Sequence, residues 1–290
     1  MRVRPIVALA AVLAGTASAQ DRSDPLTRPI ASDRAAEWLA PRAPVRVFGN
    51  TYLVGFGGLS VALIDTGKGL ILIDGALPQA EPAILANVAR LGFRPRDIKY
   101  ILSTEPHFDH AGGLAALARD TGATVVASAR GAAGLRAGRL AADDPQLGYD
   151  GRFPPVARIR VIADRAVLRL GTVAITARAT PGHTLGSMSW SWPSCAAGRC
   201  KAIVFASSLN AVSADAYRYS APSSRAIVAG YRRSYATMRT VPCDILITAH
   251  ADQNGSPGRF STDPRACQPY AGESKRRLSA RLQAEARGKP

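Results

Sequence analysis

The chain has 290 residues, 47% of them hydrophobic, and a formal net charge of +16 at pH 7. This length can bury a large core, either as one domain or as two fused halves. A strong positive charge can indicate a nucleic-acid partner. Here the arginines are scattered and form no dense run with aromatic residues, so we expect no nucleic-acid role and only loose attraction to anionic surfaces of the cell envelope.

Residues 1–19 have the pattern of a secretory signal peptide. Arg2 and Arg4 give a positive start, residues 6–14 are apolar, and the small residues 17–19 form a cleavage site. The apolar run is too short to span a bilayer, and no later stretch is long enough to do so. We therefore expect an exported, periplasmic protein without membrane insertion. Because the signal removes two arginines, the mature chain carries a net charge of +14.

Short apolar runs bounded by turn residues predict strands, and apolar residues at helical spacing predict helices. The first half, about 45–155, has predicted strands at 45–48, 52–55, 61–65, 70–74, 98–102 and 124–127, and helices at 78–91, after Gly113, and at 128–140. The second half, about 156–290, has predicted strands at 158–162, 167–170, 173–179, 187–192, 201–206 and 245–248, and helices at 223–239, with Ser223 as N-cap, and from about Gly272. This alternation indicates an α/β protein in which residues 20–290 form a single domain of two similar halves.

The stretch 103–113, S-T-E-P-H-F-D-H-A-G-G, directly follows a predicted strand. Glu105, His107 and Asp109 stand at alternate positions, so an extended loop would turn all three to one side and His110 to a neighbouring point. The final Gly-Gly pair would let the backbone turn tightly into the next helix. Imidazole nitrogen and carboxylate oxygen both bind Zn²⁺, so this grouping suits a metal ion.

The other two histidines, His183 and His250, also come just after predicted strands. A single His near a strand end is more often a hydrogen-bonded structural residue than a metal ligand. Here all four histidines of the chain follow strand ends, where the sites of open α/β sheets are found. We therefore predict a site for two metal ions.

Three motifs carry a family resemblance. H-F-D-H-A-G-G (107–113), P-G-H-T-L-G-S (181–187) and T-A-H (248–250) resemble the metallo-β-lactamase superfamily and, more closely, the third subclass of the class B β-lactamases. Further matches cover nearly all of the mature chain in the family's order. They are Trp38 before a proline-rich stretch, V-F-G-N-T-Y-L-V-G (47–55), L-I-L-I-D-G-A-L (70–77) and F-A-S-S-L-N-A-V-S-A-D (205–215).

The resemblance implies a four-layer αβ/βα sandwich with the site at the shared edge of the two halves. It also implies a zinc-dependent enzyme, active as a monomer, that hydrolyses the β-lactam ring of penicillins, cephalosporins and carbapenems. A hydroxide shared by two Zn²⁺ ions would attack the lactam carbonyl, and Asp109 would orient it. The implied ligands are Glu105, His107 and His183 for metal one, and Asp109, His110 and His250 for metal two. The alternatives are a lactonase or thioesterase on the same scaffold and an inactive exported zinc-binding homologue.

The chain departs from the family pattern at two places. The family usually has His where this chain has Glu105, and the carboxylate lowers the charge of a site with two Zn²⁺ and one hydroxide from about +2 to about +1. We expect weaker Lewis acidity at metal one, or, if Glu105 points away, no metal one. The segment 206–210 lacks the metal-bridging Asp of many superfamily hydrolases, which favours the lactamase branch over thioesterase, phosphodiesterase and sulfatase branches.

Three residues are candidates for binding the substrate. By resemblance, Ser208 would hydrogen-bond a metal-bound water, Asn210 would bind the substrate carboxylate, and Trp38 would belong to a flap over the site. Each has a simpler alternative: either polar side chain could cap a local turn, and Trp38 could be a packing anchor. Asp74, at a strand end, is expected to accept hydrogen bonds near the metal loop rather than to bind metal. The loop 141–155 is either a surface loop or a rim of the site.

The four cysteines are Cys195, Cys200, Cys243 and Cys267. An even number in an exported chain favours disulfides, and the spacings are not those of paired C-x-x-C metal sites. A Cys195–Cys200 bridge would close a short turn between two strands. A Cys243–Cys267 bridge would tie the last strand to the C-terminal segment, where the family often has one. The spacing alone leaves the connectivity open.

Overall fold

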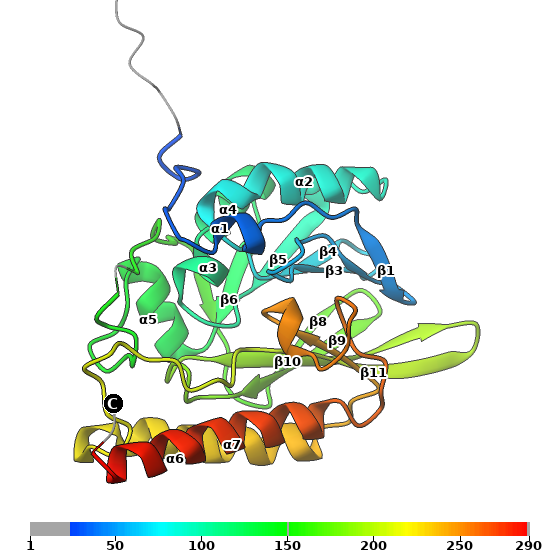
Figure 1. Ribbon diagram of the computed structural model, residues 1–290. Coiled ribbons are helices and arrows are strands. Elements are labelled where there is room, and N and C mark those ends of the chain that lie inside the picture. Colours follow the sequence, from blue (N-terminus) through cyan, green and yellow to red (C-terminus); the bar gives the residue numbers. More distant parts are fainter. Residues whose placement is uncertain (1–23, 150, 289–290) are drawn as a thin grey trace, which may run out of the picture.

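The computed structural model describes residues 24–149 and 151–288, so the predicted signal peptide lies outside the described residues. Two sheets face each other, and helices cover the outer face of each (Figure 1). This arrangement is the αβ/βα sandwich that the sequence motifs implied. Within the described ranges, no helix combines the length and the apolar character needed to cross a bilayer.

The first sheet contains seven strands in chain order. Neighbouring strands from β1 to β4 pair antiparallel, and those from β4 to β7 pair parallel. The strands are β1 (Val45–Phe48), β2 (Thr51–Leu53), β3 (Ala62–Asp65), β4 (Leu70–Ile73), β5 (Ile98–Leu102), β6 (Thr124–Ala127) and β7 (Ile159–Val161).

The second sheet contains five strands in the order β12-β11-β10-β9-β8. Strands β11 and β12 pair parallel, and the other pairs are antiparallel. The strands are β8 (Val167–Leu170), β9 (Val173–Ala179), β10 (Met188–Ala196), β11 (Arg199–Ala206) and β12 (Ile245–Thr248).

Helices form the two outer layers and one end of the molecule (Figure 1). In Figure 1, α2 and α4 lie above the first sheet, and α6 and α7 lie side by side below the second. The helices are α1 (Ala35–Trp38), α2 (Glu81–Arg90), α3 (Phe108–Ala111), α4 (Leu114–Thr121), α5 (Ala129–Ala137), α6 (Arg225–Thr240) and α7 (Cys267–Ala286), and the 3-10 turns are η1 (Pro78–Ala80), η2 (Pro95–Asp97), η3 (Pro222–Ser224) and η4 (Ala251–Gln253).

Alternation along the strands produces the layers, because successive side chains of a strand point to opposite faces. In β3, Leu63 packs in the cluster that includes α2 and α4, whereas Ile64 packs against the second sheet. In β11, Phe205 belongs to the layer between the sheets, and Val204 packs under α6 and α7. Buried residues of both sheets meet between them, so one shared core joins the two sheets.

Three sequence predictions about elements were wrong. Strand β7, which we grouped with the second half, completes the first sheet, because α5 returns the chain for a parallel pairing with β6. Helix α6 begins after Ser224 rather than Ser223, and the Ser224 hydroxyl donates to the Arg218 carbonyl instead of capping the helix. Helix α7 begins at Cys267 and continues through the glycine at which we had begun it, because its buried face packs under the second sheet.

The structure contains the disulfides Cys195–Cys200 and Cys243–Cys267. The first joins opposite residues of β10 and β11 near their hairpin end. The second ties the segment that leads into β12 to the start of α7. Since α7 covers the second sheet, this bridge attaches the C-terminal layer to the sheet.

Candidate metal centre

The six predicted ligands lie at one edge of the two sheets, where several strands end. The metal loop follows β5, His183 lies between β9 and β10, and His250 follows β12. Strands β9, β11 and β12 run in the same direction, so their carboxyl ends meet at this edge. The sandwich therefore brings together side chains that are far apart in sequence.

The metal loop is extended only in its first part. Its second part forms the short helix α3, which carries Asp109 and His110. The prediction that Asp109 turns to the same side as Glu105 and His107 was therefore wrong, because a helical turn replaces the alternation of an extended chain.

Gly112 and Gly113 are required by close packing rather than by a special backbone angle. Neither has a positive φ. A Cβ at Gly113 would lie 2.3 Å from the Gly75 carbonyl oxygen, and one at Gly112 would lie 2.4 Å from Pro78 Cδ. We had predicted that these glycines permit a tight turn, and this was wrong, because close packing is what requires them. The two glycines let α3 approach the loop after β4.

Glu105, His107 and His183 form the first group of candidate ligands. One ligand atom from each lies within 4.8 Å of the other two. The Glu105 Oε1 atom is 3.8 Å from His183 Nε2, and the rings of His107 and His183 meet edge to face with centroids 4.8 Å apart. The Glu105 carboxylate thus points into the group and not away from it.

Asp109, His110 and His250 form the second group, by the same 4.8 Å criterion. Asp109 Oδ2 lies 3.3 Å from His250 Nε2 and 3.5 Å from His110 Nε2, and the two ring nitrogens are 3.2 Å apart. Glu105 Oε1 is 3.2 Å from His110 Nε2, so the two groups adjoin through this carboxylate.

The site is a buried cluster of opposite charges. Burial would raise the pKa of Asp109, but the neighbouring His110 and His250 hold it well below its usual range. Burial would lower the pKa of His110, but Asp109 and Glu105 raise it to about 10. The pKa of Glu105 is lowered against its burial by the three histidines around it, whereas burial lowers the pKa of His183. Both carboxylates are therefore ionised.

The donor atoms fit a pair of metal ions. Among the described residues, Glu105 Oε1 and the Ser208 hydroxyl are buried without a hydrogen-bond partner. A buried polar atom without a hydrogen-bond partner costs free energy. The same holds for the ring nitrogens of His110 and His250, which lie close together and need a proton or a cation between them. Imidazole nitrogens and carboxylate oxygens in threes match the ligand set of a catalytic Zn²⁺ site.

Neighbouring polar groups hold the candidate ligands. The Ser208 backbone N–H donates to Glu105 Oε2 at 3.1 Å. His183 Nδ1 donates to the Asn210 carbonyl at 2.8 Å, which leaves Nε2 free on the metal side. Asp74 accepts hydrogen bonds from the Thr104 N–H and hydroxyl, at 2.8 and 2.6 Å, and lies beside His110, as expected for a supporting carboxylate.

A cavity of about 500 Å³ opens over the two groups. Trp38 lines it and packs against His250, with ring centroids 5.6 Å apart, and Ser208 and Asn210 also line it. All three candidates for substrate binding thus face the space above the ligands. Trp38 is buried as well, so its packing role and its place at the site coexist.

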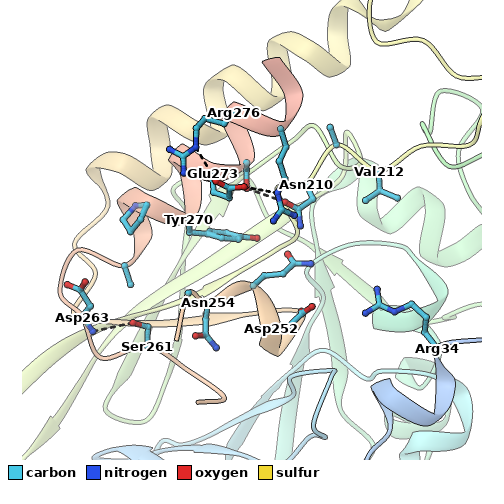
Figure 2. Close-up of a pocket in the computed structure, with 17 residues that line it drawn as sticks. Arg34, Asn210, Val212, Asp252, Asn254, Ser261, Asp263, Tyr270, Glu273 and Arg276 are labelled. Carbon is cyan, nitrogen blue, oxygen red and sulfur yellow. Dashed lines mark hydrogen bonds and ion pairs between the residues drawn. The ribbon is translucent and has the colours of Figure 1, made fainter. Parts of the chain in front are cut away.

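A second cavity, of about 580 Å³, adjoins the first and shares Arg34, Asn210, Val212 and Gln253 with it. Figure 2 shows Tyr270 and Glu273 of α7 on one side of this cavity and Asp252 and Arg34 on the other. The cleft over the ligands therefore continues into a groove lined by charges of both signs.

A family model for the metallo-β-lactamase superfamily matches residues 46–195, which are more than half of the chain. The chain belongs to the metallo-β-lactamase superfamily. It is 66% identical to a solved B3 metallo-β-lactamase described as the first with an active-site glutamic acid; the match covers 91% of this chain and 99% of that one, with a TM-score of 0.89. It is 41% identical to the Rm3 metallo-β-lactamase, over 89% of this chain and 100% of that one, with a TM-score of 0.84.

A curated superfamily relative is more distant. Over 142 residues the chain is 35% identical to a hydroxyacylglutathione hydrolase of Anaeromyxobacter dehalogenans (strain 2CP-C). This match spans 49% of the present chain and only 41% of the relative's length. The similarity to that enzyme is thus confined to a shared part of the superfamily fold.

Two residues of this superfamily member were not singled out from the sequence. Asp144 Oδ2 lies 3.0 Å from His107 Nε2, and the Gln146 amide nitrogen lies 3.1 Å from His183 Nε2. Both residues belong to the loop 141–155, for which we had left open whether it is a surface loop or a rim of the site. A carboxylate in such a loop was the only available signal, and many surface loops share it.

Proposed function

We propose that this protein is an exported, zinc-dependent β-lactamase that hydrolyses the lactam ring of penicillins, cephalosporins and carbapenems. The observation that carries the proposal is the convergence of two three-ligand groups, one containing Glu105, beneath an open cavity. The 66% identity to a B3 enzyme with an active-site glutamic acid supports it. Both groups come from one chain, which supports an active monomer.

In this proposal each group holds one Zn²⁺ ion. Glu105, His107 and His183 hold the first, and Asp109, His110 and His250 hold the second. Zn²⁺ supplies a lowered pKa of water and polarisation of a carbonyl oxygen when it is bound. Three protein ligands for each ion leave positions open for water and substrate.

In this proposal, four further roles at the site belong to side chains of the protein. Asp109 lies below the cavity and orients the attacking water as well as binding metal. The Ser208 hydroxyl, which has no partner among the described residues, is free to donate a hydrogen bond into the cavity. Asn210 binds the substrate carboxylate, and Trp38 shields the site from bulk water.

Export to the periplasm is part of the proposal. The charged start, the apolar run and the small-residue cleavage site of residues 1–19 support it. The two disulfides support an oxidising compartment.

The test is hydrolysis by the purified protein. We expect it to open imipenem, to lose this activity when dialysed against a chelator, and to regain it when Zn²⁺ is added. A thioester hydrolase is the second candidate, favoured by the similarity to a hydroxyacylglutathione hydrolase. Faster turnover of an acyl-glutathione thioester than of imipenem would replace the lactamase proposal, and turnover of neither would leave a zinc-binding protein without these activities.

A further inference from the structure

Asp144 reaches the first ligand group from the loop after α5. Its Oδ2 atom lies 3.0 Å from His107 Nε2, and the side chains of His107 and Asp144 are only 4% and 2% exposed. A carboxylate in this position accepts the Nε2–H of the ring. The proton on Nε2 then leaves Nδ1 as the ring nitrogen with a lone pair.

The Nδ1 atom is on the metal side of the ring. The Gln146 amide nitrogen lies 3.4 Å from His107 Nδ1 and 3.1 Å from His183 Nε2, so these two ring nitrogens face the same point. His107 therefore offers Nδ1 to that point, whereas His183 offers Nε2, because its Nδ1 donates to a backbone carbonyl. The two rings of the first group are held in opposite tautomers.

The other oxygen of Asp144 is also in use. Asp144 Oδ1 accepts the backbone N–H of Gln146 at 2.8 Å, which fixes the turn that brings the Gln146 side chain to the ligand group. An aspartate satisfies both contacts because each of its oxygens is an acceptor. An asparagine has one acceptor oxygen and one amino group, so it can satisfy the histidine or the backbone N–H but not both.

We propose that Asp144 is a positioning residue that fixes the tautomer and orientation of His107 and thereby raises the affinity of the first metal ion. The inference rests on the proposed metal centre and adds a residue to it. A carboxylate partner makes a ligating imidazole more basic and holds its ring, and loss of such a partner typically lowers metal affinity about 10–100-fold. His183 has a neutral carbonyl partner, so within the first group the carboxylate acts through His107 alone.

The substitution Asp144→Asn tests this role, and Asp143→Asn is its matched control. Asp143 is the adjacent residue, half-exposed, and paired with Arg130 rather than with a ligand. In competition with a chromophoric chelator, we expect Asp144→Asn to bind one of two Zn²⁺ ions about 10–100-fold more weakly and the other as the parent does. Asp143→Asn should bind both as the parent does.

A spectroscopic readout separates positioning from a general structural effect. In protein loaded with Co²⁺, Asp144→Asn should change the ligand-field bands of one ion, and saturating Zn²⁺ should restore most of kcat. Unchanged affinity for both ions would overturn the proposal. So would an equal loss at both sites together with a lowered melting temperature, because that pattern indicates a disturbed fold.

The unmodified protein provides a second, independent test that does not depend on folding of the variant. In long-range ¹H–¹⁵N NMR spectra of the zinc-loaded parent, we expect His107 to carry its proton on Nε2 and His183 to carry it on Nδ1. A proton on Nδ1 of His107 would refute the inference. If the parent binds two zinc ions but hydrolyses no β-lactam, the proposed function fails while these affinity and NMR results still decide the role of Asp144.

Discussion

Replacing Glu105 by glutamine should weaken the first metal site and also lower the stability of the metal-free protein. Glu105 is 1% exposed, and its Oε1 atom lies 3.2 Å from His110 Nε2. In the metal-free protein the surrounding histidines hold this buried carboxylate ionised and lower its pKa, and the neutral amide loses their attraction. In the loaded protein the carboxylate faces a dication, and the amide loses that attraction.

The size of the effect follows from the charges. Two unit charges about 4 Å apart attract by about 4 kcal/mol at an effective dielectric constant of about 20, and a dication doubles this value. A loss of only about 2.7 kcal/mol already corresponds to a hundredfold weaker site. At a zinc concentration about 100 times the parent Kd, the first site would then stabilise the parent by about 2.7 kcal/mol and the variant by roughly 0.4 kcal/mol. For a mature chain of about 270 residues, the zinc-induced rise in Tm should be smaller by roughly 4 °C.

The assay is calorimetric unfolding of parent and Glu105→Gln, each with chelator and with Zn²⁺. The matched control is Glu273→Gln, the same chemical change at a carboxylate that pairs with Arg276 and Arg277 on α7. The control should show the parent's zinc-induced rise. An undiminished rise in Glu105→Gln would refute the assignment of Glu105 as a ligand. An unchanged Tm of metal-free Glu105→Gln would refute the reasoning about its buried charge.

Three further predictions concern parts around the site. Tyr231→Phe removes an O–H that donates at 2.7 Å to the Asn210 carbonyl, and it should lower the free energy of unfolding in a urea titration by about 1 kcal/mol. Because the same carbonyl accepts the N–H of the ligand His183, zinc binding should weaken slightly. Burial raises the pKa of Glu81 to about 7, above its ordinary 4.5, so the folded state keeps a proton that the unfolded state has lost. The parent should therefore lose stability relative to Glu81→Gln as pH rises from about 4.5 to 7. If the urea midpoints of parent and variant differ by the same amount at pH 5 and at pH 8, this prediction is contradicted. Replacing Cys243 and Cys267 by serine opens a bridge with a sequence separation of 24 and should lower the unfolding free energy by roughly 3 kcal/mol, and a loss below about 1 kcal/mol would argue against the bridge as a stabilising link.

The position of the metal ligands could be predicted from the sequence because the ligands closely follow recognisable strands. The strand before His250 is buried throughout, and the strand before the metal loop ends on the buried Ile101 and Leu102 although Lys99 within it is exposed. The ends of both strands place polar residues at one edge of a sheet. A family motif then assigned the ligands to two ions, and the groups in the structure have the same composition. The pattern of the residues alone had put Asp109 in the wrong group, because it could not show that an extended loop gives way to a helical turn.

Contacts that depend on the path of a long connection could not be predicted. Asp144 is 37 residues from His107 in sequence, and their hydrogen bond depends on how the loop after α5 folds back over the site. The sheet to which β7 belongs depends likewise on a crossover through α5. In both cases the local sequence is compatible with more than one arrangement, and only tertiary packing decides between them.

The most direct test of the central claim is an anomalous-difference map at the zinc edge from a crystal of the zinc-loaded protein. The account predicts two peaks, one bound by Glu105, His107 and His183 and the other by Asp109, His110 and His250. A single peak, or zinc bound only by residues outside these two groups, would contradict it.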